Sequence, residues 1–456
     1  MMEMKGIHHQ QRRITRLSAR TAVLAFLLST RLSTVVAQEP WQHSHDAGLK
    51  AAAESRFADA EALLMQSIRE ARKAAEASLM EARSDVDLGE VYRAEHKYDL
   101  ALPCYDEALK VLAKLNKSDA IEAAEALDRQ GEVYIAVTDY PHAEPVLVQA
   151  LKIRREKAPS DEALMAQVEA DLAGVYAATN KDAEAAALFK DALANRQKLN
   201  ASAGRKDDED EQAARLFYDL GNLAKKAQRW PEAEQDFRKA VSAYGKVLGG
   251  DHPDYANAME GLAMSYSARE QYDLAEPLLV RVLEIRQKTL GEDHHDVAVA
   301  LDSLALVAMH QRRSQLAVDY YQRALKIWEK IFGPESPGLS ADLGNLAVAY
   351  QIGGRFAEAE SPLRRAVTND QKGLPPDSPD LASDLQNLAM LYANSKRLGE
   401  AIPLFKSALA IRVKALGESD PDTLDTLKYL VSTLRRLNRD QEAAAIEQQF
   451  TAGGKP

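Results

Sequence analysis

The chain has 456 residues, a formal net charge of −11 and a single cysteine. One cysteine excludes a disulfide framework and a thiolate zinc cluster, and the acidic balance argues against nucleic acid as the main partner. Apolar residues make up 46% of the chain. That content is enough for a large core and too high for a disordered protein.

The first 37 residues have the composition of a secretory signal. A basic stretch is followed by an apolar run at 22–28 and by small residues that end at Ala37. This order is typical of a signal peptide, and the apolar run is too short to span a bilayer, which takes about 20 residues. Arg31 departs from the pattern, and a disordered basic tail or an organelle transit peptide is the alternative. We expect cleavage near Ala37 and a periplasmic or secreted bacterial protein.

The rest of the chain repeats with a period of 42 residues. An alanine recurs once per repeat, with one step of 41 residues, one of 48 and all others of 42. The long step contains a charged insertion within 200–211, which costs little free energy in a loop between repeats. The recurring alanines are Ala60, Ala101, Ala143, Ala185, Ala233, Ala275, Ala317, Ala359, Ala401 and Ala443.

Two further positions recur with the alanine and indicate a pair of helices in each repeat. Apolar residues after the alanine follow a 3.6-residue period, and no stretch alternates like a strand. Twelve residues before the alanine, nine of the ten repeats carry Gly or Ala, with Val431 the exception, and a small residue there lets two helices approach closely. Three residues before the alanine most repeats carry a bulky residue: Phe57, Tyr98, Tyr140, Trp230, Tyr272, Phe356 and Leu398.

The helix ends are also marked periodically. Glycine follows four of the five predicted ends of second helices, as in a left-handed C-terminal cap. These ends are predicted at Leu248, Leu290, Phe332, Leu374 and Leu416. Four residues beyond each of the last three ends, a side chain suited to an N-cap precedes a proline. These predicted N-caps are Ser336, Ser378 and Asp420.

The spacing of the small, bulky and alanine positions resembles the tetratricopeptide repeat (TPR). That repeat is usually about 34 residues long, and the 42-residue form is similar to the kinesin-light-chain type. Residues 343–350, 290–294 and 354–360 carry the resemblance most clearly, over a span of about 43–450. No heptad coiled coil for a motor heavy chain accompanies it. The resemblance therefore concerns the type of repeat.

The resemblance implies an all-α, right-handed superhelical α-solenoid of about ten helix-turn-helix units. We expect a signal peptide at 1–37, a TPR array at 38–450 with its insertion near 200–211, and a flexible tail at 451–456. In the family, the first helix of each repeat lines a concave groove. Transferring those positions predicts partner-binding residues at Asn257, Met264, Asp302, Met309, His310, Asn345, Gln386, Asn387, Met390 and Asn394.

These residue types suit a peptide ligand. Asparagine can bind a peptide backbone as donor and acceptor together, and methionine offers adaptable apolar contact. In the N-terminal half the same positions are charged and lean acidic, which would suit a basic segment. They are Arg83, Asp87, Glu90, Arg93, Glu125, Asp128, Arg129, Glu132 and Asp171. The alternative for any one of these residues is a solvated side chain on a helix face.

Signals for chemistry are weak. The densest cluster of metal-ligand types, 293–296, falls at a predicted turn between repeats, and His43, His45 and Asp46 are no better arranged. Cys104 lies on a second helix and is expected to be a small buried residue. No nucleophile elbow, phosphate loop or dinucleotide motif occurs. We therefore predict no catalytic residue, no cofactor and no metal.

The sequence thus predicts an exported, non-catalytic scaffold whose concave groove binds a peptide or protein segment. We expect no nucleic-acid partner and no membrane span. The alternative is a structural assembly subunit that self-associates or acts through its convex face, and the oligomeric state stays open.

Overall fold

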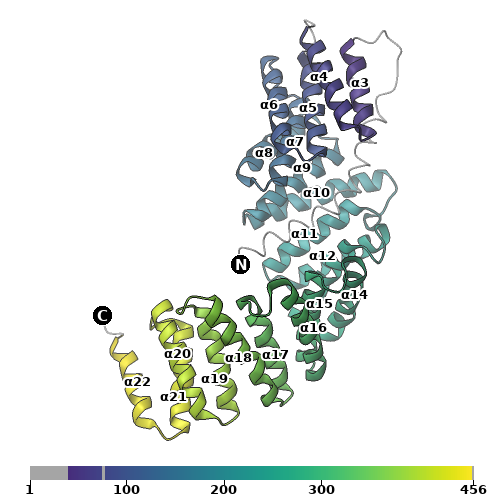
Figure 1. Ribbon diagram of the computed structural model, residues 1–456. Helices are drawn as coiled ribbons and strands as arrows, with labels where there is room; N and C mark the ends of the chain where they lie inside the picture. Colours follow the sequence, from purple (N-terminus) through teal and green to yellow (C-terminus); the bar gives the residue numbers. More distant parts are fainter. Residues whose placement is uncertain (1–39, 74–77, 454–456) are drawn as a thin grey trace. The chain divides into compact units, whose positions relative to one another are not determined.

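A computed structural model describes residues 40–73 and 78–453, so the predicted signal peptide at 1–37 lies outside the described residues. The described chain contains twenty α-helices, two short 3-10 helices and no strand, which confirms the all-α helical-repeat solenoid. The helices form ten pairs (Figure 1). None of the described helices is long and apolar enough to cross a membrane.

The first helices of the pairs are α3 Pro40–Ala53, α5 Ser78–Ala94, α7 Ile121–Ala136, α9 Glu162–Ala178, α11 Glu211–Lys226, α13 Pro253–Ala268, α15 His295–His310, α17 Ser340–Ile352, α19 Pro379–Asn394 and α21 Pro421–Arg436. The second helices are α4 Phe57–Lys73, α6 Tyr98–Lys114, α8 Tyr140–Lys157, α10 Asp182–Ser202, α12 Trp230–Val247, α14 Tyr272–Leu290, α16 Ser314–Phe332, α18 Phe356–Gly373, α20 Leu398–Leu416 and α22 Asp440–Gly453. The 3-10 helices are η1 Asp207–Glu209 and η2 Pro337–Leu339.

The chain divides into two compact units, one ending at Leu223 and the other beginning at Ala224. Helices α3 to α10 of the first unit and α12 to α22 of the second each contact the next helix in chain order. The boundary falls within α11, close to the predicted insertion. The last helix reaches Gly453, which is three residues into the segment predicted as a tail.

The recurring alanines explain why the helices pack so regularly. All ten have no exposed surface, and each second helix begins three residues before its alanine, at the predicted bulky position. The small position on the first helix is confirmed as a close approach. A Cβ added at Gly131 would lie 2.5 Å from Leu147 Cδ2, and one at Gly89 would lie 2.5 Å from the Tyr105 ring. Such contacts leave no room for a larger side chain.

The turn inside each repeat carries a feature that the sequence did not reveal. One residue there has a positive φ between 55° and 73° in every repeat, and only one of the ten is glycine. A positive φ is uncommon for residues with a Cβ, although asparagine tolerates it better than most. These residues are Ser55, His96, Thr138, Asn180, Gln228, Glu270, Arg312, Gly354, Lys396 and Asn438.

The helix ends agree with the predictions in part. Gly291 and Gly417 have φ of 89° and 94° with ψ of 160° and 165°, an extended region open essentially to glycine alone. Positive φ is therefore confirmed, but not the helical left-handed cap. Ser378 and Asp420 cap α19 and α21 as predicted. Ser336 instead caps η2, because a 3-10 turn precedes α17.

A buried position on the second helices links neighbouring helices through polar contacts. Arg154, Arg196, Arg286 and Arg412 occupy it in four repeats and are each at least nine-tenths buried. Arg196 Nη2 donates to Asp210 at 2.8 and 2.9 Å, which fastens the charged insertion to α10. A buried charge is costly unless it is hydrogen-bonded, so each of these arginines marks a specific contact with a neighbouring element.

Candidate functional site

Three consecutive first helices of the second unit, α13, α15 and α17, expose an apolar side chain at the same position of the repeat. Met264, Leu306 and Val348 are 43%, 48% and 43% exposed, and Met390 at the next equivalent position is half-buried. Successive members lie 42 residues apart on α13, α15, α17 and α19. The sequence prediction included Met264 and Met390 but missed Leu306 and Val348, which the 42-residue register alone would have identified.

Side chains three residues before and four residues after these positions share the same helix face. Asn345 and Asn387 lie on one flank of the apolar residues, and His310 and Asn394 lie on the other, all four exposed. Ile352 is 50% exposed and was not predicted. We define the inner row by these three positions on four helices: Gly261, Met264, Ala268, Ser303, Leu306, His310, Asn345, Val348, Ile352, Asn387, Met390 and Asn394.

The inner row contains no Asp, Glu, Lys or Arg, although 28% of the chain is charged. Two of its helices, α17 and α19, are in direct contact. The His310 ring stacks on Tyr272 with centroids 4.6 Å apart, which fixes the imidazole at the edge of the row. An exposed surface with apolar side chains and amides, but without charge, suits a ligand that offers apolar side chains and backbone amides.

Two predicted groove residues are already engaged by second-helix arginines. Asn257 Oδ1 accepts a hydrogen bond from Arg286 Nη2 at 3.2 Å. Gln386 Oε1 accepts from Arg412 Nη1 at 2.8 Å and from the Thr426 hydroxyl at 2.7 Å. Both amides therefore serve helix packing in the structure, because the arginine of the same repeat reaches them from the second helix.

Asp302 is also engaged, and Met309 lies beside the row. The Trp328 indole donates to Asp302 Oδ2 at 3.0 Å. Burial, with a smaller contribution from the Asp342 carboxylate, raises the pKa of Asp302 to about 7. Met309 is half-buried on α15. The predicted residues that the structure brings together in the row are thus Met264, His310, Asn345, Asn387, Met390 and Asn394.

In the first unit, the charged positions on α5 and α7 form a closed network. Arg93 pairs with Glu90 at 2.5 Å and with Glu132 at 2.9 Å, and Arg129 pairs with Glu132 at 2.8 Å. The Tyr105 hydroxyl donates to Glu90 at 2.7 Å. Burial alone would raise the pKa of Glu90, but the charges of Arg93 and Arg129 lower it to about 2. These side chains neutralise one another.

The remaining charged positions of the first unit are paired as well. Asp87 accepts from His45 at 2.7 Å, and Arg83 lies 3.7 Å from Glu122. The Arg154 Nε donates to the buried Asp128 at 2.6 Å, and Asp171 accepts from a glutamine one turn earlier at 2.8 Å. Glu125 also has an interaction partner. This half offers less unpaired negative charge than its sequence suggested.

The residues considered for metal or nucleophilic chemistry have structural contacts. His294 Nδ1 accepts from the Asp296 backbone N–H at 3.1 Å and caps α15, as His252 caps α13. No group of three or more metal-ligand side chains is arranged for an ion among the described residues. Cys104 is half-buried with Sγ 3.3 Å from the Leu100 carbonyl, and burial raises the pKa of its thiol to about 12.

Comparison with known families bears on this architecture directly. The family model described as Tetratricopeptide repeat matches residues 80–156, 212–288, 260–308, 296–372 and 381–452, which together are more than half of the chain. The chain belongs to the tetratricopeptide repeat family. No curated protein matches the chain.

Solved structures that resemble this TPR protein include repeat proteins of several kinds. A putative kinesin light chain from Podosopora anserina is 27% identical over 46% of this chain and 99% of its own, with a TM-score of 0.43. BtubC from P. vanneervenii is 21% identical over 52% of this chain and 92% of its own, with a TM-score of 0.43. Apo RapI is 13% identical over 88% and 98%, with a TM-score of 0.54. At that identity, the likeness to RapI shows the fold alone.

Proposed function

We propose that this TPR protein is a non-catalytic scaffold that binds a peptide or protein segment on the inner row of its second unit. One observation carries the proposal: four consecutive first helices have an apolar side chain at the same uncharged position of the repeat, exposed on three of them and half-buried on the fourth. Exposed apolar side chains at a recurring position favour a ligand that runs across several repeats.

The exposed asparagines give the row its second kind of contact. Asn345 and Asn387 each lie one helical turn before an apolar member, so a bound backbone could bond to the amide while its side chain contacts Val348 or Met390. The absence of charge from these positions favours such a ligand over nucleic acid, which binds mainly through its phosphates.

Paired affinity capture tests the proposal. The wild-type chain, a Leu306→Asp/Val348→Asp variant and a control variant serve as baits in extract from the source organism. The control, Leu274→Asp/Ile331→Asp, changes two exposed apolar residues on second helices by the same chemistry. We expect a polypeptide held by the wild type and the control to be lost with the row variant. Equal capture by all three baits would refute the inner row as the site.

The alternative function, self-association, has its own measurement. Light scattering over a hundredfold range of concentration gives the mass of the wild type and of both variants. A mass that rises with concentration, and that the row substitutions leave unchanged, would favour an assembly subunit acting through another face.

We also propose that the protein is exported. The support is the order of basic residues, apolar run and small residues that ends at Ala37. N-terminal sequencing of the protein recovered from its own cells should begin at Gln38, and recovery of an uncleaved chain from the cytoplasm would contradict export.

A further inference from the structure

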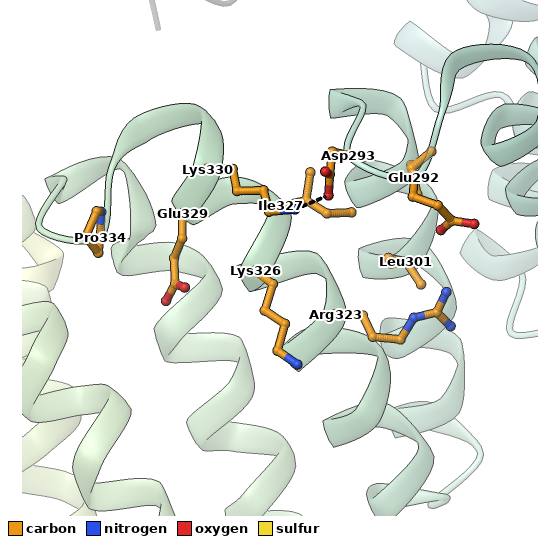
Figure 2. Close-up of a pocket in the computed structure, with 10 residues that line it drawn as sticks. Glu292, Asp293, Leu301, Arg323, Lys326, Ile327, Glu329, Lys330 and Pro334 are labelled. Atoms are coloured by element: carbon orange, nitrogen blue, oxygen red, sulfur yellow. Dashed lines mark hydrogen bonds and ion pairs between the residues drawn. The ribbon is translucent and has the colours of Figure 1, made fainter.

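A cavity of about 470 Å³ opens where α15, α16 and the two loops that flank them meet. Val297 and Leu301 of α15 and Ile327 of α16 form its apolar floor, and all three are buried. Figure 2 shows charged side chains of α16 and of the loop before α15 around this floor. The volume lies in the range of ordinary ligand pockets, roughly 300–1,000 Å³.

The acidic side chains at the rim are all engaged. Asp293 accepts from Lys330 at 2.6 Å, a contact drawn in Figure 2. Glu329 accepts from Arg365 of the next repeat at 2.5 Å, and Glu292 accepts from a glutamine amide at 2.5 Å. Lys330 and Arg365 therefore compensate the charges of Asp293 and Glu329, whereas Glu292 is bonded to a neutral amide and keeps its negative charge.

Two cations at the rim differ from these acids. Arg323 and Lys326 lie three residues apart on α16, both exposed, and within the described part of the chain neither forms an ion pair or a side-chain hydrogen bond. Residues three apart lie on the same helix face, so their charges act together. Among the rim groups without an ion pair, these two cations outnumber the single carboxylate, Glu292.

The neighbouring repeats show what an arginine at this position otherwise does. Arg281, one repeat earlier, donates to the Gly250 carbonyl at 3.0 Å and pairs with Asp251 at 2.8 Å. Arg365, one repeat later, donates to the Pro334 carbonyl at 2.6 Å. Both arginines close the loop that precedes their repeat. Arg323 lies at the same position of its repeat but forms no such bond to the preceding loop. Its guanidinium is therefore available to a ligand.

The cavity and the inner row lie on different sides of α15. Leu306 follows Val297 by nine residues, which corresponds to about 180° around an α-helix. The same helix therefore presents Leu306 to one surface and the cavity floor to the opposite one, and one ligand segment cannot cover both.

We propose that this cavity is a second binding site, for an acidic peptide segment with an aliphatic side chain beside its carboxylates. The aliphatic side chain would lie over Ile327 and the methylene groups of Arg323 and Lys326, above the buried Val297 and Leu301. A carboxylate would pair with the Arg323 guanidinium in a bidentate manner, and Lys326 would add a second cationic contact. Charge complementarity favours this partner, because the rim groups without an ion pair are two cations and only one carboxylate, Glu292. The site does not depend on the function proposed for the inner row.

Methyl-labelled NMR of the full chain tests the location directly. The probe is a blocked peptide of sequence GSELDLSG, and its neutral counterpart is GSQLNLSG. We expect GSELDLSG to cause saturable shifts of the Val297, Leu301 and Ile327 methyl groups while those of Leu306 and Val348 stay in place. The neutral peptide should bind at least about tenfold more weakly, and added salt should weaken the acidic one.

Charge reversal supplies the second arm of the test. Arg323→Glu/Lys326→Glu should lower the affinity for GSELDLSG by at least about tenfold. The matched control, Lys190→Glu/Lys198→Glu, changes two exposed lysines of α10 and should bind as the wild type does. Shifts centred on the inner row, no saturable shift at millimolar peptide, or equal binding by the two variants would each overturn the proposal. The wild-type shifts remain decisive even if a variant fails to fold.

Discussion

Both terminal nitrogens of Arg286 donate to the carboxylate of Glu260, each at 2.7 Å. The contact joins α14 to α13, and Nη1 also donates to the Asp296 carbonyl of α15 at 3.3 Å. One buried side chain therefore ties together three consecutive helices. Arg412 does the same in the last helix pair but one, where it donates to Gln386 and to the Asp422 carbonyl.

Replacing Arg286 with alanine should destabilise the second unit strongly. The Glu260 carboxylate, which is only 20% exposed, would lose its partner, and breaking a buried pair in this way costs about 3–5 kcal/mol. Urea unfolding followed by circular dichroism measures the loss. The control is Arg281→Ala, whose pair with Asp251 is exposed and should contribute about 1 kcal/mol or less. Equal losses would contradict the role given to the buried pair.

The buried carboxyl of Asp384 predicts a pH dependence. Burial, the Asp370 carboxylate and the more distant Asp380 together raise the pKa of Asp384 to about 7, although the Ser340 hydroxyl opposes the shift. Between about pH 4 and pH 7 the Asp384 carboxyl is therefore protonated in the folded state and ionised in the unfolded chain. The resulting stabilisation is complete below about pH 4 and is lost as the pH rises through 7.

Thermal unfolding at pH 6 and pH 8 checks this expectation. The wild type should lose on the order of 1–3 kcal/mol more than an Asp384→Asn variant between the two values, because the amide cannot ionise. Asp425→Asn, at an exposed carboxylate paired with Lys428, is the control and should behave as the wild type. A variant with the same pH profile as the wild type would assign the dependence to other groups.

Gly131 should tolerate no side chain. An alanine Cβ there would lie 2.5 Å from the fully buried Leu147, so Gly131→Ala should lower the free energy of unfolding by about 1–3 kcal/mol. Gly174 lies on α9 with nothing within 4 Å of the added Cβ. Gly174→Ala should instead stabilise by up to about 1 kcal/mol, as expected for helix propensity. Chemical denaturation of the two variants should give changes in unfolding free energy of opposite sign, which separates the effect of packing from that of helix propensity.

The turn between α15 and α16 offers a stabilising substitution. Arg312 has a φ of 59°, and its side chain forms no ion pair with any described residue. Arg312→Gly should stabilise by on the order of 0.5–1 kcal/mol, because glycine removes the left-handed strain at some cost in chain entropy. Gly354→Ala, at the equivalent turn one repeat later, should destabilise by a similar amount. If both substitutions raised, or both lowered, the free energy of unfolding, the turn would not be strained.

The candidate site could be predicted only in part. Met264, Asn345 and Asn387 follow from the repeat register, because the register fixes which helix face each residue occupies. Asn257 and Gln386 share that register but bind the arginines of second helices. Those contacts depend on side-chain conformations across a helix interface, and a single repeat pattern does not encode them.

The sequence by itself determined the repeat, its 42-residue period, the helix pairs and the family. These follow from local spacing, since a helix face and a helix end are set by residues a few positions apart. Only the tertiary structure decided which polar side chains are free and which are paired. Arg281, Arg323 and Arg365 occupy the same place in three repeats, yet Arg323 lacks the bond to the preceding loop that the other two form. The difference arises because each guanidinium can bond either to the neighbouring loop or to solvent, and that choice depends on the packing around it.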